Sequence, residues 1–390
     1  MDSFKFLSKN FLGISISGLL YFGSFYLLLP ILPIYVENLG GATHEIGLVI
    51  GIFTVSSVIL RPYFGKLTDI YGLRKFLLIG TALFALPYIT YIFIDSTTIL
   101  MPVRFFHGLT YGIYLTAVYA YVANLAPENR RGEVIGVFSL ISTTGMAIFP
   151  ALSTFIISTT NNFTILFLLG SAMVIVAFIA VYIIDEQQIT SEETAPVSIM
   201  AVLTRKPVII SSLTLCTMAA TYGTIFTFLP VYAPSKGIYD ISLFFIVYSV
   251  FTLSSRIFAG KMSDKYGRYK VILPFMVLNM MSLLLLTVMN STIIMLAVAA
   301  LFGLGFGGFI PALNAYLVDE TRREERASSL AVFSSFIDIG IAFGAILFGF
   351  IAHLKDYPTM FIAAAIFIVF GFILFAVGAR KSSSPSNIDC

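Results

Sequence analysis

Long apolar runs separated by short polar segments dominate the pattern along this chain. A helix needs about 20 apolar residues to cross the hydrocarbon core of a bilayer. Twelve runs come close to that length, and we predict a membrane-spanning helix in each: 12–36, 46–64, 76–94, 98–124, 134–158, 163–184, 208–232, 241–260, 271–289, 292–318, 328–353 and 358–379.

These runs predict helices rather than the strands of a barrel. An unpaired backbone group in hydrocarbon costs several kcal/mol, so each span must satisfy its own hydrogen bonds. A barrel would show segments of about ten residues with alternating polarity, whereas the runs here are continuously apolar. The predicted fold class is therefore all-α, a polytopic membrane protein with twelve transmembrane helices.

The positions of the basic residues give the twelve spans an orientation. Cytoplasmic loops of membrane proteins hold most of the Lys and Arg residues. Of the 23 here, eighteen fall on one side of the layout, against Lys236 and Lys355 in loops on the other side. We therefore expect a multi-pass protein of the plasma or inner membrane with both termini cytoplasmic. Segment 185–207 becomes a polar cytoplasmic linker, in which 199–203 has the composition of a short surface helix.

Composition narrows the range of functions. Charged residues make up 11% of the chain, the mean hydropathy is +0.96, and the net charge of +3 is scattered along the sequence. Nucleic acid is therefore not an expected partner, whereas membrane lipid is. The cysteines, Cys216 and Cys390, and the three distant histidines lack metal-ligand spacing, and no catalytic motif is present. We expect no cofactor, no metal site and no enzymatic activity.

The chain contains an internal repeat. Residues 60–75, LRPYFGKLTDIYGLRK, align with 255–270, SRIFAGKMSDKYGRYK, at an offset of 195 residues. The same offset pairs Gly108 with Gly303 and Gly112 with Gly307, and nearer the start an offset of 197 pairs Pro33 with Pro230. An even number of spans per copy predicts two parallel halves related by an axis along the membrane normal. The predicted domains are 1–184 and 208–379, with the linker 185–207 between them and a cytoplasmic tail at 380–390.

A glycine-containing loop motif follows the second predicted helix and returns after the eighth. Its first copy runs Gly65-Lys-Leu-Thr-Asp69-Ile-Tyr-Gly72-Leu-Arg74-Lys75, and its second copy contains Asp264, Gly267 and Arg268. So short a loop needs glycines for the turn, an Asp facing the positive N-terminal end of the next helix, and basic residues that fix orientation.

This motif closely resembles the loop motif of the major facilitator superfamily, and the resemblance covers essentially the whole chain. The pattern is most similar to bacterial twelve-helix drug/proton antiporters. The resemblance implies a gate between the halves in which Asp69 stabilises the outward-facing state, with Asp264 as a weaker counterpart. The gating set it implies is Gly65, Asp69, Gly72, Arg74, Asp264, Gly267 and Arg268. A role in topology alone is the alternative, which we favour for the basic residues.

The fourth predicted helix carries Arg104-Phe-Phe-His-Gly108-Leu-Thr-Tyr-Gly112, similar to the Arg-x-x-x-Gly pattern of proton-coupled members. A buried Arg costs several kcal/mol unless it finds a partner or water. Helical periodicity places Arg104, His107, Tyr111 and Tyr114 on one face, which predicts a polar and aromatic stripe. We assign Arg104 and His107 to proton coupling and Tyr111 and Tyr114 to the substrate cavity, with helix packing as the alternative for His107 and Tyr114.

Prolines and glycines in two further helices complete the predicted cavity. Pro30 and Pro33 resemble the proline pair in the first helix of drug/proton antiporters, and proline frees backbone carbonyls and bends a helix. Gly145 and Pro150 keep the spacing of a motif similar to the antiporter motif of the fifth helix, although Phe149 stands where that motif has glycine. These residues favour export as the direction of transport.

Asp338 is the acidic residue placed deepest in any predicted span. It lies twelve positions beyond Arg326, and a rise of 1.5 Å per residue puts it about 18 Å into the membrane. It shares a face with the small residues Ser335, Ala342 and Ala345. Intramembrane acids are functional candidates by default, so we assign the coupled proton to Asp338. The structural alternative is a permanent ion pair with Arg104, and Glu37 or His107 would carry the proton if Asp338 does not.

The resulting functional hypothesis is a secondary active transporter, acting as a monomer, that exports a small amphipathic molecule in exchange for protons. A proton symporter for a sugar or a small organic acid is the alternative. A channel is disfavoured because the sequence has no repeated filter loop or ring of charged residues.

Overall fold

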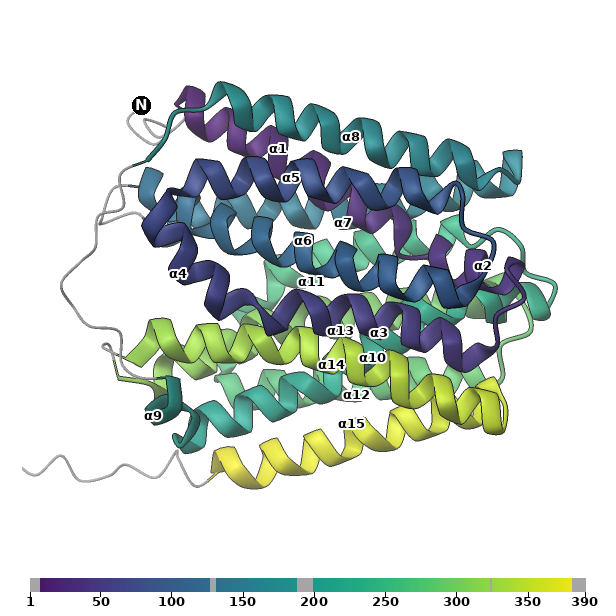
Figure 1. Ribbon diagram of the computed structural model, residues 1–390. Helices are drawn as coiled ribbons and strands as arrows, with labels where there is room; N and C mark the ends of the chain where they lie inside the picture. Colours follow the sequence, from purple (N-terminus) through teal and green to yellow (C-terminus); the bar gives the residue numbers. More distant parts are fainter. Residues whose placement is uncertain (1–7, 127–130, 188–198, 323–324, 381–390) are drawn as a thin grey trace, which may run out of the picture. The chain divides into compact units, whose positions relative to one another are not determined.

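The computed structural model describes residues 8–126, 131–187, 199–322 and 325–380, and every regular element in those ranges is a helix. The helices, drawn in Figure 1, are α1 (Lys9–Leu28), α2 (Ile31–Asn38), α3 (Thr43–Ile59), α4 (Arg61–Tyr71), α5 (Leu73–Tyr91), α6 (Thr97–Leu125), α7 (Arg131–Thr160), α8 (Phe163–Ile183), α9 (Ile199–Leu203), α10 (Lys206–Ser235), α11 (Ser242–Tyr266), α12 (Arg268–Thr287), α13 (Thr292–Glu320), α14 (Arg326–Leu354) and α15 (Tyr357–Arg380).

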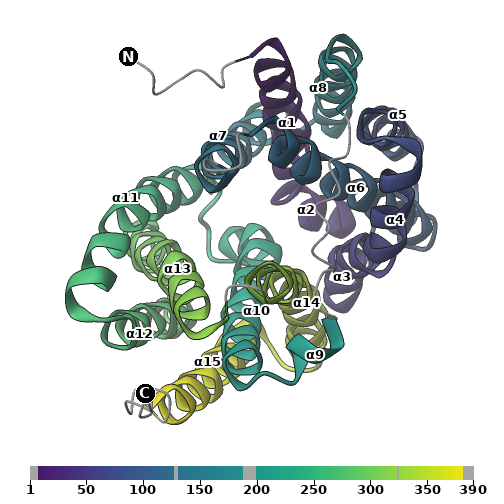
Figure 2. The ribbon, with the colours of Figure 1, turned by 90° about the vertical axis from the view of Figure 1, so that its left-hand side faces the viewer.

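The chain forms two compact units. Unit 1 comprises residues 1–192 together with the short segment 239–242, and unit 2 comprises residues 193–238 and 243–390. Unit 1 therefore contains α1 to α8, and unit 2 contains α9 to α15. Within each unit the long helices run side by side, as the end-on view in Figure 2 shows. In unit 1, α1 packs on α7 and α8 while α6 packs on α3 and α5; in unit 2, α10 packs on α14 and α15.

Ten helices in the described ranges are long and apolar enough to cross a membrane. Two further helices complete the twelve predicted spans. One is α3, which has 17 residues and is continued by α4. The other is α6, which has 29 residues and contains Arg104, His107 and several tyrosines. The observed architecture agrees with the predicted fold class.

Two of the predicted continuous spans are interrupted. The run 12–36 is divided into α1 and α2, with Pro30 preceding α2, and the run 46–64 is divided at Leu60, just before Pro62 at the start of α4. Proline lacks the N–H that a helix interior needs and its ring crowds the preceding turn. The prolines therefore explain both interruptions, and α2 and α4 continue the spans after each break.

The glycines paired by the repeat bring helix backbones together. A Cβ at Gly108 would lie 2.1 Å from the Phe53 carbonyl oxygen, and one at Gly112 would lie 2.4 Å from that of Ser57. In unit 2, Gly303 and Gly307 make the same kind of approach to α11. Small residues spaced by four allow such close helix contacts in membranes. These glycines hold α6 against α3 and α13 against α11.

Candidate functional site

The polar face of α6 is buried inside unit 1. Arg104 is 2% exposed and His107 and Tyr114 are fully buried, while Tyr111 is half-buried. The predicted stripe therefore exists as a cluster of side chains enclosed by α1, α3, α5 and α6. The contacts of Arg104 and His107 define its chemistry.

Arg104 is held by uncharged groups. Its Nε donates to the carbonyl oxygen of Val49 at 3.3 Å, and its Nη1 donates to the hydroxyl of Tyr91 at 3.4 Å. The guanidinium carbon lies 4.2 Å from the centre of the Phe53 ring, a favourable cation–π geometry. None of the unit 1 carboxylates that the structure describes forms an ion pair with it. Unit 1 thus buries a positive charge that Arg cannot lose by deprotonation.

His107 extends this network. Its Nδ1 lies 2.7 Å from the Tyr91 hydroxyl and 3.4 Å from Arg104 Nη1. Because a guanidinium nitrogen can only donate, Nδ1 must accept, and the neutral ring then carries its proton on Nε2. His107 Nε2 is buried and has no hydrogen-bond partner among the described residues. The hydrogen bonds run from Arg104 through the Tyr91 hydroxyl to the imidazole.

Aromatic rings enclose the cluster. The His107 ring centre lies 4.1 Å from that of Phe84, 5.2 Å from that of Tyr88 and 5.5 Å from that of Phe53. Tyr111 reaches the same wall, with its ring 5.4 Å from Phe53. These contacts exclude water from the charged group, which strengthens every electrostatic interaction in the cluster.

The remaining predicted cavity residues are Tyr114 of α6, Pro30 and Pro33 at α2, and Gly145 and Pro150 of α7. Tyr114 stacks on Tyr21 at 3.7 Å and its hydroxyl shares a 2.9 Å hydrogen bond with Ser17 of α1. Gly145 of α7 faces Gly23, because a Cβ at Gly145 would lie 3.5 Å from the Gly23 nitrogen. Pro150 is buried within α7, and Pro33 is buried within α2 just after Pro30. These residues therefore lie where helices of unit 1 pack closely, and their role in a substrate cavity stays a prediction.

Asp338 lies near the middle of α14 in unit 2 and is half-buried. Its helix packs tightly on α10, because a Cβ at Gly340 would lie 2.5 Å from the Cys216 carbonyl oxygen and one at Gly344 would lie 2.0 Å from that of Ala220. The nearby Ala342 and Ala345 are also buried. Asp338 thus belongs to a helix that packs through small residues, and its role in proton coupling stays a prediction.

The second copy of the loop motif forms an ionic cluster in unit 2. Arg268 donates to Asp264, to the Ser263 hydroxyl at 2.7 Å and to Asp319 at 2.9 Å. Gly267 has φ of 88°, so the glycine expected for the turn is required there. Asp264 pairs with the side chain of Arg268, the first residue of α12, and no side-chain hydrogen bond caps that helix. The gating role of Asp264 stays a prediction.

The first copy of the motif is organised differently. Gly72 has φ of 94°, and the backbone N–H of Arg74 donates to Glu186 at 3.0 Å. The Arg74 guanidinium donates to the Tyr182 carbonyl at 2.6 Å. Gly65 lies in α4 near Thr116 of α6. The side chain of Asp69 lies outside what the structure describes, so its gating role stays a prediction.

Sequence reasoning missed Tyr91 and Glu186. Tyr91 connects Arg104 to His107, and Glu186 accepts a hydrogen bond at the N-terminus of α5. The repeat offers a signal for Tyr91, because this position differs in polarity between the two copies. Its counterpart at an offset of 195 is the apolar Leu286, just as the counterpart of Arg104 is the apolar Ala299.

Comparison with known proteins places the chain among transporters. The family model described as Major Facilitator Superfamily matches residues 14–255 and 237–388. The MFS-type transporter MJ1560 of Methanocaldococcus jannaschii is 24% identical over 355 residues, covering 88% of this chain and 92% of that protein. The multi-drug resistance efflux pump PmrA of Streptococcus pneumoniae is 24% identical over 369 residues, covering 90% and 92%. The crystal structure of the nucleoside transporter NupG matches with a TM-score of 0.79 at 15% identity, covering 94% of this chain and 99% of that one.

Proposed function

Because this chain belongs to the major facilitator superfamily, we propose that it exports a small amphipathic molecule in exchange for protons by alternating access of its two units. The family consists of membrane transporters rather than enzymes, and the chain is a multi-pass transporter of small molecules. Beyond this, we propose the direction of transport, the proton as the coupling ion, and the residues that take part in coupling. It also places both termini and the linker in the cytoplasm and the protein in the cell membrane as a monomer.

The observation that carries the proposal is the fixed positive charge in unit 1. Arg104 stays charged, so any change of charge during transport must come from a group that titrates. Among acidic residues of the predicted spans, Asp338 lies deepest, and His107 contacts the Arg104 network directly. We assign the exchanged proton to Asp338 and a positioning role to Arg104 and His107.

Export is supported by the proline pair at α2 and by the Gly145 and Pro150 pattern of α7, which are similar to antiporter motifs. The efflux activity named for PmrA supports the same direction. An amphipathic substrate is supported by the aromatic wall at Tyr111, Phe53 and Phe84, because aromatic rings offer large apolar surfaces to a partly apolar ligand. In this proposal α2 and α7 form moving walls of the substrate cavity and contribute Pro30, Pro33, Gly145 and Pro150.

Everted membrane vesicles test the direction and the coupling together. Respiration acidifies their interior, and a panel of lipophilic cations, neutral amphiphiles and anions is added outside while a pH-sensitive dye reports the gradient. Antiport predicts that a transported compound enters the vesicle and discharges the acid gradient at a saturable rate. Vesicles without the protein are the control. Compound uptake that is saturable but unaffected by an uncoupler would contradict proton coupling, and uptake in right-side-out vesicles only would support the symport alternative.

A further inference from the structure

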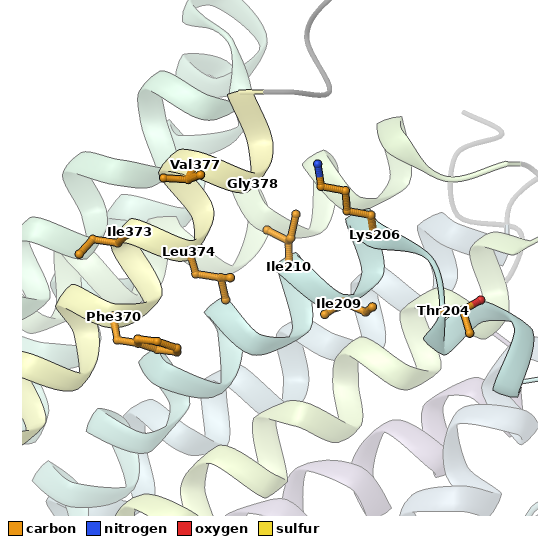
Figure 3. A pocket seen from close by; sticks show the side chains of 9 residues that line it. All are labelled: Thr204, Lys206, Ile209, Ile210, Phe370, Ile373, Leu374, Val377 and Gly378. Carbon is orange, nitrogen blue, oxygen red and sulfur yellow. The ribbon is translucent and has the colours of Figure 1, made fainter.

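A groove on unit 2 runs between α10 and α15 and has a volume of about 510 Å³. Its walls are Ile209 and Ile210 of α10 and Phe370, Ile373, Leu374, Val377 and Gly378 of α15, shown in Figure 3. The helices meet closely along it, because a Cβ at Gly378 would lie 2.5 Å from Ile210 and one at Gly371 would lie 2.1 Å from Thr217. Both helices are candidate membrane spans, and Phe370, Ile373 and Val377 on the groove wall are exposed, so the groove is open to the hydrocarbon of a bilayer.

One end of the groove is positively charged. Lys206 lies there, at the first residue of α10 and the same end as Gly378 near the end of α15 (Figure 3). The neighbouring Arg205 is neutralised by Glu325 at 2.6 Å, whereas Lys206 forms no ion pair with any carboxylate in the described ranges. No described side chain caps the N-terminus of α10. A lysine ammonium and an uncapped helix N-terminus both favour an anion at this point.

We infer that this groove binds an anionic phospholipid, with an acyl chain between α10 and α15 and the phosphate headgroup at Lys206. The apolar walls match a hydrocarbon chain, and the charge at the end of the groove lies at the membrane surface, where a headgroup would sit. From Gly378 to Phe370 the helix rises by about 12 Å, so the walls contact a substantial part of one chain. A zwitterionic lipid fits the walls equally well but lacks net charge complementary to Lys206.

Quenching by brominated lipids tests this site, because the chain contains no Trp. Phe370→Trp introduces one fluorophore in the groove wall at an exposed aromatic position. The matched control is Ile175→Trp on the exposed face of α8, a helix without Lys or Arg. Each full-length variant is reconstituted in phosphatidylcholine with increasing fractions of brominated phosphatidylglycerol, and brominated phosphatidylcholine serves as the reference.

At Phe370→Trp we expect phosphatidylglycerol to bind about fivefold more tightly than phosphatidylcholine, the preference expected of one lysine near a charged headgroup. At Ile175→Trp the two lipids should quench equally. Adding Lys206→Ala should remove the preference, while Lys236→Ala at the other end of α10 should leave it unchanged. Equal quenching by both lipids at Phe370→Trp, the same preference at both probes, or a preference that survives Lys206→Ala would overturn the inference.

Discussion

Unit 1 and unit 2 descend from one repeat but bury different side chains at equivalent positions. In unit 1 those positions hold a cation, an imidazole and a phenol, and in unit 2 they hold apolar groups; the pairs are Arg104 with Ala299, His107 with Phe302 and Tyr91 with Leu286. Phe302 instead joins a stack of rings, 5.5 Å from Tyr248 and 5.6 Å from Phe306. In unit 2 the candidate for the exchanged proton, the half-buried Asp338, is on another helix, α14.

The glycine positions that set the α6 and α13 contacts and the loop turns, in contrast, behave alike in the two units. Gly108 and Gly303 both approach a carbonyl oxygen of the neighbouring helix, and Gly72 and Gly267 share a positive φ. A side chain at any of these positions would clash or strain the backbone. The comparison shows that the duplicated scaffold is held by glycines, while buried positions that require no special backbone geometry have diverged in chemistry.

Prolines account for the other difference. Pro30 precedes the break between α1 and α2, and its counterpart in unit 2 is Thr227 within the continuous helix α10. Pro62 follows the break at Leu60, and its counterpart is Ile257 within the continuous helix α11. Unit 1 therefore has two interrupted spans where unit 2 has continuous helices, and both interruptions have a local cause.

Replacing buried polar residues of unit 1 with their counterparts from unit 2 should have the largest effect on transport. The double variant Arg104→Ala with His107→Phe installs the residues found at Ala299 and Phe302, which pack well in unit 2. Because an intramembrane charge costs several kcal/mol and is retained as a rule for function, we expect gradient-driven transport to fall at least about 100-fold while the thermal midpoint in detergent changes little. Normal transport by the folded variant would assign the cluster to packing alone.

Filling the tightest glycine contact among the described residues of unit 1 should destabilise that unit. In Gly108→Ala the new methyl group would lie 2.0 Å from the Ser56 hydroxyl and 2.1 Å from the Phe53 carbonyl, and such overpacking costs about 1–3 kcal/mol. Gly303→Ala meets the Tyr248 carbonyl at 2.6 Å and should cost less. Gly136→Ala, which has open space around it, is the control for thermal unfolding. Equal midpoints for the three variants would refute the packing argument.

The two loop motifs should differ in their influence on transport. Asp264 is 70% exposed in its pair with Arg268, and exposed ion pairs contribute little. We expect Asp69→Asn to slow transport about tenfold and to reduce the outward-facing population, and Asp264→Asn to have a smaller effect. Transport rates and cysteine accessibility of the outer face report these outcomes. Equal rates and populations in Asp69→Asn and the parent protein would reduce Asp69 to a topological role.

The caps of the last helix in each unit give the smallest predicted effect. The Thr359 N–H donates to the Asp356 carboxylate at 2.7 Å, and the hydrogen bonds from Thr359 hold the pKa of Asp356 below its usual value. With the folded pKa below the unfolded one, this stabilisation is fully present above the ordinary Asp pKa of about 4 and is lost as the pH falls through the folded value. Asp356→Ala should lower the unfolding midpoint slightly at pH 7.

The pH dependence separates this cap from its counterpart in unit 1. The Asn162 side chain caps α8 by accepting from Thr164 at 2.9 Å, and an amide does not titrate. The gap between Asp356→Ala and the parent protein should close below about pH 4, while the gap for Asn162→Ala should stay constant. A constant gap for both variants would show that the charge of Asp356 does not contribute.

The spans, the repeat and the stripe on α6 were predictable because each follows from periodicity or from a fixed offset along the chain. The partners of these residues were not. Tyr91 meets His107 only because α5 and α6 pack in one register, and Glu186 reaches Arg74 across 112 residues of sequence. The break at Leu60 had a signal in Pro62, whereas the pairing of Asp264 with Arg268 depends on side-chain conformations that a pattern of residues does not determine.

Asp338→Asn in proteoliposomes tests most directly the claim that unit 1 holds a fixed charge and unit 2 the exchanged proton. Asparagine keeps the volume and hydrogen-bonding shape of aspartate but cannot ionise. The account predicts that substrate movement driven by a pH gradient is lost, while exchange of labelled for unlabelled substrate across the membrane persists, because a neutral site can still alternate between its two faces. Gradient-driven transport at the parent rate across the pH range would contradict the account.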